Sequence, residues 1–174
     1  MRKKELINAF FGENRILGVK LSNQRYEETK QVVVQMYEKL NVSCIPINCF
    51  EIASKMNIKV IPYYAYPKKT QTLLLKKSED GFNNTIMHEI GHIVLDHTED
   101  SELAEKEVKF FAKFALAPPV LIHKLKLNSP EDISKTFEIS YEAACNALSY
   151  YYKWLRYGNS QYTDYEEKML YLFS

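Results

Sequence analysis

The chain has 174 residues, 46% of them hydrophobic, which is enough to bury the core of one ordinary globular domain. Its 23 basic and 22 acidic residues leave a net charge of +1, which argues against direct nucleic-acid binding. We see no sustained apolar segment typical of a signal peptide or a membrane span, and the three cysteines lack C-x-x-C spacing. We therefore expect a cytoplasmic protein with reduced thiols and no membrane contact.

The elements predicted up to residue 76 are helices followed by a small sheet. Residues 1–22 are expected to form an N-terminal arm or a short helix. Apolar residues at helical spacing predict a helix over 24–41, and an asparagine at position 48 is suited to cap a second helix over 48–56. Residues 58–64 and 72–76 are typical of strands. This order predicts a small β-sheet that leads into the next helix.

The next predicted helix covers the segment from Asn83 to about His97. Asp80-Gly81 is a turn signal before it, and Asn83 or Asn84 is suited to cap its start. Its apolar residues recur at helical spacing over most of the circumference, so we expect this helix to be buried.

That helix carries the pattern H-E-x-x-H in His88, Glu89 and His92. Residues four apart on a helix project about 40° from each other, one turn up, so the two imidazoles can reach one metal ion. The carboxylate of Glu89 lies close enough to touch a water on that metal without binding the metal itself. Zn2+ suits this ligand set, and the arrangement points to metal-dependent hydrolysis of an amide.

A third metal ligand is expected from the acidic run that follows. A predicted helix over 101–117 ends before Pro118-Pro119, and its apolar face has Glu107 at its middle and Glu105 at its edge. Because burying an unpaired carboxylate is costly, the helical wheel alone favours Glu107 as the ligand. His97 lies about 140° from His92 on a continuous helix, so we interpret it as a C-terminal cation or a surface group.

Three further helices are predicted after the two prolines. They cover 120–127, 140–155, with Ser140 as N-cap, and 164–173. The second contains an aromatic group, Tyr150, Tyr151, Tyr152 and Trp154. Such residues pack in cores and also concentrate at protein-binding hot spots, so both core packing and partner docking are open readings.

Three pieces of the chain resemble the ImmA/IrrE family of zinc metallopeptidases. The first is HEIGHIVLDH at 88–97, and the second is EKEVKFFAKFALAP at 105–118, similar to a family helix of the form E-x-x-A-N-x-F-A-x-x-L-L-x-P. The third is FEISYEAA at 137–144, similar to the family step F-x-V-S-x-x-A-A into a helix. The resemblance covers about residues 24–155, and its specificity lies in the order and spacing of the pieces.

The resemblance implies an α+β, zincin-like fold that is mostly helical, with a small β-sheet leading into the H-E-x-x-H helix. It implies a metallopeptidase domain over 23–157, after the N-terminal arm. Residues 158–174 would then be a C-terminal helix, packed on the domain or binding a partner.

Carried over residue by residue, the family's metal ligands fall on His88, His92 and Glu105, with Glu89 as general base. The resemblance therefore favours Glu105 over Glu107, against the helical wheel. The chain departs from the family pattern where Val108 and Lys109 replace the usual Ala and Asn. The asparagine position neighbours the site, so Lys109 bears on the hydrogen bonds around the metal.

The function implied by the resemblance is zinc-dependent, site-specific cleavage of a helix-turn-helix transcriptional repressor, which derepresses a prophage, a mobile element or a stress regulon. The sequence does not choose among five oxyanion donors: Tyr63, Tyr64, Tyr66, His123 and Tyr141. The alternative is a regulatory module of the same fold that binds and controls a repressor without cutting it. A component of a toxin–antitoxin pair is a third reading.

Overall fold

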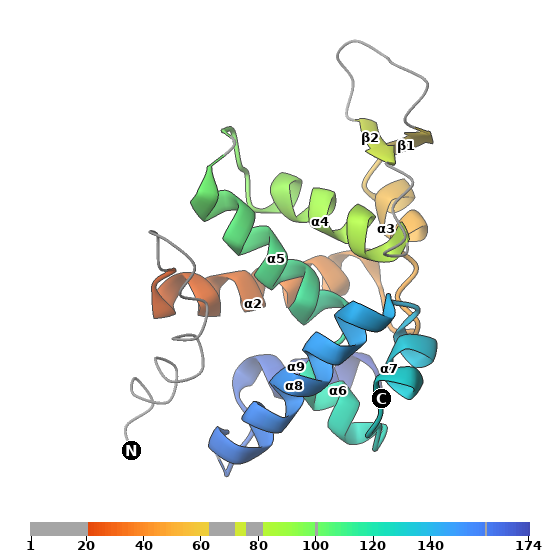
Figure 1. Cartoon of the computed structure of the whole chain (residues 1–174). Coiled ribbons are helices and arrows are strands. Elements are labelled where there is room, and N and C mark those ends of the chain that lie inside the picture. Colours follow the sequence, from red (N-terminus) through yellow and green to blue (C-terminus); the bar gives the residue numbers. More distant parts are fainter. Residues whose placement is uncertain (1–20, 63–71, 76–81, 100, 159) are drawn as a thin grey trace.

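The computed structural model describes residues 21–62, 72–75, 82–99, 101–158 and 160–174. Over these residues the protein is mostly helical with little strand (Figure 1). Helix α5 runs through the middle, with α4 along one part of it and the C-terminal helices gathered at its other end (Figure 1). The expected N-terminal arm at 1–22 lies almost wholly outside the described residues. No helix among the described residues is both long enough and apolar enough to cross a membrane.

The first two described helices begin and end as their sequence predicts. Helix α2 spans Asn23–Leu40 and α3 spans Cys49–Lys55. The side chain of Asn48 caps α3 by accepting a hydrogen bond from the backbone N–H of Glu51. Asn41 ends α2 in the left-handed conformation that short polar side chains tolerate.

Two four-residue strands follow, β1 at Lys59–Pro62 and β2 at Thr72–Leu75. They pair in parallel, with Lys59 opposite Thr72 and Pro62 opposite Leu75. The expected strand residues 63, 64 and 76 lie outside the described residues. They lie at one corner of the molecule, β1 against α3 and β2 against α4 (Figure 1).

Helix α4 spans Phe82–Val94, so the expected N-cap asparagines are already inside it. The prediction of an asparagine cap is therefore wrong. Asn83 has another role: its side-chain oxygen accepts a hydrogen bond from the backbone N–H of Cys49, and its amide donates to the carbonyl of Glu138, both at 3.4 Å. The start of α4 is thereby tied to the start of α3 and to the end of the helix α7 (Pro130–Phe137).

Helix α5 spans Glu102–Leu116, capped by the hydroxyl of Ser101, and packs closely on α4. The contact is closest at Gly91, where an added Cβ would lie 3.0 Å from the Phe111 ring and 3.2 Å from Val108. Both neighbours are fully buried. Glycine at this position therefore lets the two helices approach closely enough to share one site.

The C-terminal end of α5 depends on two buried tyrosines. Pro118 and Pro119 have no N–H, so the carbonyls of Phe114 and Ala115 have no partner four residues ahead. The hydroxyl of Tyr165 donates to the Phe114 carbonyl at 2.7 Å, and that of Tyr37 donates to the Ala115 carbonyl at 2.9 Å. The prolines that stop the helix thus create two acceptors, which α2 and the C-terminal helix α9 satisfy.

The remaining helices are α6 (Pro119–Lys124), α7 (Pro130–Phe137), α8 (Tyr141–Tyr157) and α9 (Asp164–Leu172). Ser140 caps α8, as expected. Helix α7 is not among the elements predicted from the sequence, although Ser129 followed by a proline and two acids is a strong start signal. Helix α9 packs against α2 and α6.

Candidate metal centre

The candidate centre lies where α4 passes the first turns of α5. His88 and His92 stand one turn apart on α4, with ring centroids 5.2 Å apart. Glu105, near the start of α5, faces both of them. One ligand atom from each of these three side chains lies within 4.8 Å of the other two. The structure thus brings together the three residues that the resemblance selected.

The contacts from Glu105 to the two histidines are close to the ligand separations around a small tetrahedral ion. Each histidine faces a different carboxylate oxygen: Glu105 Oε2 lies 3.5 Å from His88 Nε2, and Glu105 Oε1 lies 3.2 Å from His92 Nε2. Tetrahedral zinc with bonds of about 2.0–2.2 Å separates its ligand atoms by about 3.3–3.6 Å. Two imidazoles and a carboxylate are also a ligand set that leaves a fourth position for water. The residues present therefore fit Zn2+.

Burial and nearby charges at the centre lower the pKa of His88. Partial burial lowers the pKa of His88, and the charges of His92 and Lys109 lower it further, whereas Glu105 and Glu89 raise it. A neutral imidazole is the form that binds a metal. Lys109, the departure from the family pattern, is therefore close enough to act electrostatically on the centre.

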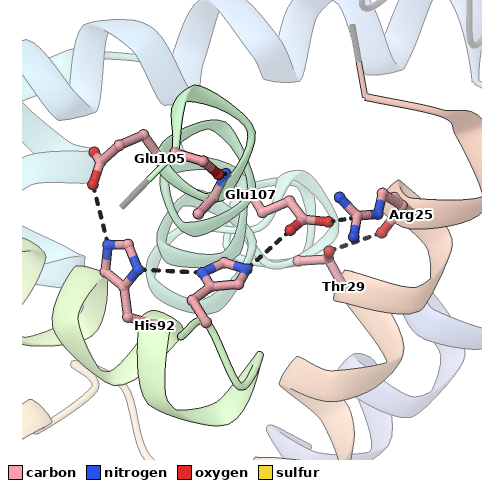
Figure 2. A network of polar contacts seen from close by, with 8 residues as sticks. Arg25, Thr29, His92, Glu105 and Glu107 are labelled. Carbon is pink, nitrogen blue, oxygen red and sulfur yellow. Dashed lines mark hydrogen bonds and ion pairs between the residues drawn. The ribbon is translucent and has the colours of Figure 1, made fainter. Parts of the chain in front are cut away.

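Glu107 does not join this group and has different partners. Its side chain is 9% exposed and accepts from Arg25 Nε at 3.3 Å and from His97 Nε2 at 2.9 Å. The helical wheel was right that Glu107 is buried. It could not show that Arg25, on α2, supplies the countercharge. Figure 2 shows the resulting line of contacts from Glu105 through His92 to Glu107 and Arg25.

His97 lies beside His92 because the helix ends before it. Helix α4 stops at Val94, and Asp96 takes the left-handed conformation with φ of 55°. The N–H of His97 then bonds to the carbonyl of His92, and that of Asp96 to the carbonyl of Ile93, which is the Schellman pattern. The turn brings His97 Nδ1 to 3.2 Å from His92 Nδ1. The expected surface position is wrong, since it assumed a continuous helix and the side chain is 12% exposed.

Of the five expected oxyanion donors, two lie among the residues that the structure describes. Tyr63, Tyr64 and Tyr66 lie outside the described residues. His123 Nδ1 is 3.0 Å from the hydroxyl of Tyr151, between α6 and α8. Tyr141 is 56% exposed, and the nearby Glu131 carboxylate and the Cys145 thiol raise its pKa. His123 and Tyr141 thus contact residues that lie outside the candidate centre.

The aromatic group of α8 divides between core and surface. Tyr151 is buried, whereas Tyr152 is 52% exposed, and Trp154 stacks on Tyr162 with the ring planes 8° apart. The indole N–H of Trp154 donates to Glu166 at 2.6 Å, which ties α8 to α9. Part of this aromatic group therefore holds the C-terminal helices together.

Comparisons with known proteins agree with this geometry. The sequence model of the M78 peptidase family, described as the IrrE N-terminal-like domain, matches residues 49–149, which include α3 to α7 and the first part of α8. No curated protein and no solved structure matches the chain. The match covers more than half of the chain and contains all three ligand candidates. The chain belongs to the IrrE N-terminal-like family of metallopeptidases.

Proposed function

We propose that this protein is a zinc-dependent endopeptidase that cuts a helix-turn-helix transcriptional repressor at one site in the cytoplasm. The observation that carries the proposal is the juxtaposition of His88, His92 and Glu105 at ligand distances in a member of a metallopeptidase family. The repressor as substrate is what the ImmA/IrrE resemblance implies. Cutting it would derepress a prophage, a mobile element or a stress regulon.

In the proposed mechanism His88, His92 and Glu105 would hold the metal, and Glu89 would be the general base. A zinc ion held there would polarise the scissile carbonyl and lower the pKa of a water. Glu89, next to His88 on α4, would accept the proton of the water that attacks the carbonyl carbon. It would then pass that proton to the leaving amine as the C–N bond breaks.

The ligand geometry supports the proposed role of Glu89 as the base. Glu105 takes the carboxylate position beside the two histidines, so Glu89 is not needed as a ligand. Glu89 is half-buried, and its charge is close enough to raise the pKa of His88. A carboxylate in this position can move a proton across the site.

The test is the intact mass of the repressor encoded by the neighbouring gene after incubation with this protein. Wild type, Glu89→Gln and chelator-treated wild type are compared side by side. The proposal expects one discrete cut with untreated wild type and none in the other two samples. A repressor that stays intact with wild type while co-purifying with it would contradict the proposed cleavage.

A second candidate function is a regulatory module that controls the repressor by contact alone. The observation that favours it is the exposed aromatic surface around the end of α8, where Tyr152, Leu155 and Tyr157 are each at least 38% exposed. Exposed tyrosines such as these two are typical of protein-binding hot spots. The same experiment separates the two functions. If the protein only binds the repressor, wild type and Glu89→Gln should bind it equally well and leave it uncut.

A further inference from the structure

A line of polar side chains begins behind the candidate metal centre and ends on a helix outside the matched family domain. It runs from His92 through His97 and Glu107 to Arg25, as Figure 2 shows for its labelled members. Arg25 lies in the first turn of α2, ahead of the residues 49–149 that the family model covers. Thr29 donates its hydroxyl hydrogen to the carbonyl of Arg25 at 2.8 Å.

The donor and acceptor roles along this line follow from chemistry. An ionised carboxylate only accepts hydrogen bonds, so His97 Nε2 must carry the hydrogen that it directs at Glu107 Oε2, 2.9 Å away. In a neutral imidazole the other nitrogen is then an acceptor. His97 Nδ1 therefore accepts, and the nitrogen 3.2 Å from it, His92 Nδ1, must donate.

The other face of His92 carries the nitrogen that would bind the metal. His92 Nε2 lies 3.2 Å from Glu105 and within reach of a shared metal ion. A neutral imidazole that binds a metal through Nε2 keeps its one hydrogen on Nδ1. With a metal bound, His92 Nδ1 is therefore a donor, and His97 Nδ1 is the acceptor 3.2 Å away.

Burial strengthens the middle of the line. The side chains of Glu107 and His97 are only 9% and 12% exposed, so water competes little for their hydrogen bonds. Arg25 supplies the positive charge that a buried carboxylate requires. Arg25 and Glu107 thus form an ion pair that joins α2 to α5.

We propose that His97 and Glu107 are positioning residues that hold the ring of His92 in the Nδ1–H tautomer with Nε2 aimed at the metal, and that Arg25 of α2 holds Glu107 in place. This inference rests on the proposed metal centre. Hydrogen-bond partners of metal-ligating histidines typically contribute about 10- to 100-fold to metal affinity. Helix α2 is thereby part of the working centre although the family match begins after it.

The test measures zinc affinity by chelator competition and the hydrogen bond of His92 Nδ1–H by ¹H–¹⁵N NMR of the zinc-loaded protein. His97→Phe keeps the ring shape and removes both nitrogens, and Glu107→Gln keeps the shape and removes the charge. The matched control is Glu102→Gln on the same helix, because the exposed Glu102 carboxylate contacts Lys106 at 2.7 Å and not the line. Arg25→Gln probes the far end.

We expect zinc affinity to fall about 10- to 100-fold in His97→Phe and Glu107→Gln, less in Arg25→Gln, and not at all in Glu102→Gln. The Nδ1–H of His92 should give a hydrogen-bonded, slowly exchanging proton signal in zinc-loaded wild type, and His97→Phe should lose that signal. A purely structural role would leave the signal unchanged in a folded variant.

Two outcomes would overturn the inference and differ in what else they remove. If wild type binds zinc and both His97→Phe and Glu107→Gln bind it equally well, the positioning role fails while the metal centre stands. If wild type itself binds no zinc, the positioning role fails together with the proposed function. Because Glu107→Gln tests the same line as His97→Phe, a folding defect in one variant leaves the other to decide.

Discussion

The two ends of helix α5 differ in how their polar groups are satisfied. Near its start, Glu105 and Glu107 face histidines and an arginine, and Glu105 is 44% exposed. At its end, the carbonyls of Phe114 and Ala115 are buried and each accepts one tyrosine hydroxyl. The first end keeps ligand atoms available to an ion, whereas the second leaves nothing available. We call the start of α5, at Glu105, its open end and the stretch at Phe114 and Ala115 its closed end. One helix thus carries an exposed candidate site at one end, while tyrosine hydroxyls fix the other end.

The largest expected contrast is in thiol reactivity. Cys49 lies beside Tyr37 near the closed end, and burial raises the pKa of its thiol to about 12 from 9.0. Three units make the thiolate about 1,000-fold scarcer at a given pH below 9. In timed alkylation read by mass spectrometry, exposed Cys44 should react at once and Cys49 only after denaturation. Equal rates in the folded protein would show that the closed end is open to solvent.

The second largest effect is expected at the open end of α5, near the candidate metal centre. Glu105→Ala removes one of three ligand candidates, so zinc affinity should fall by more than about 100-fold, beyond what loss of a supporting hydrogen bond costs. Glu102→Ala, one turn earlier on the exposed surface, should leave it unchanged. Isothermal titration with the apo-proteins measures both. Similar affinities for the two variants would remove Glu105 from the centre.

At the closed end, Tyr37→Phe and Tyr165→Phe should each lower the free energy of unfolding by about 1–3 kcal/mol, because each strands a buried carbonyl. Tyr171→Phe is the control, since Tyr171 is 81% exposed. Urea titration followed by circular dichroism reports the difference. If the buried-site variants behave like Tyr171→Phe, the hydroxyls do not satisfy the carbonyls left by the prolines.

The smallest effect is expected at Gly91 of α4, which packs against Val108 and Phe111 between the two ends of α5. Gly91→Ala gains about 1 kcal/mol of helix propensity but overpacks against Phe111 and Val108 at a cost of about 1–3 kcal/mol. A net destabilisation of about 1 kcal/mol in thermal unfolding should accompany weaker zinc binding. Adding Val108→Ala relieves part of the overlap and should recover part of the affinity. A Gly91→Ala protein with undiminished affinity would mean that the close approach of α4 and α5 is not required.

The parts of the molecule that sequence predicted are those governed by local rules. The caps at Asn48 and Ser140 and the end of α5 before Pro118 follow from side-chain hydrogen bonds and the missing N–H of proline. The two histidines of α4 follow from helical spacing alone. Glu105 as their neighbour came from the resemblance, and the helical wheel had pointed to Glu107.

The parts that sequence did not predict depend on contacts between distant residues. The partners of Glu107 could not be identified because Arg25 lies 82 positions earlier, on another helix. His97 was misplaced because a left-handed residue at Asp96 ends α4 early, and nothing in the H-E-x-x-H pattern signals that turn. The start of α4 was misplaced because Asn83 bonds across to Cys49 and Glu138 instead of capping its own helix.

The most direct test of the account is the position of bound zinc, located by anomalous X-ray scattering from crystals grown with the metal. We expect one anomalous peak for zinc between α4 and α5, about 2.0–2.2 Å from His88 Nε2, His92 Nε2 and a carboxylate oxygen of Glu105. His97 and Glu107 should lie behind His92 without touching the ion. A peak bound by Glu107, or no peak at His88 and His92, would contradict the proposed centre and the chemistry built on it.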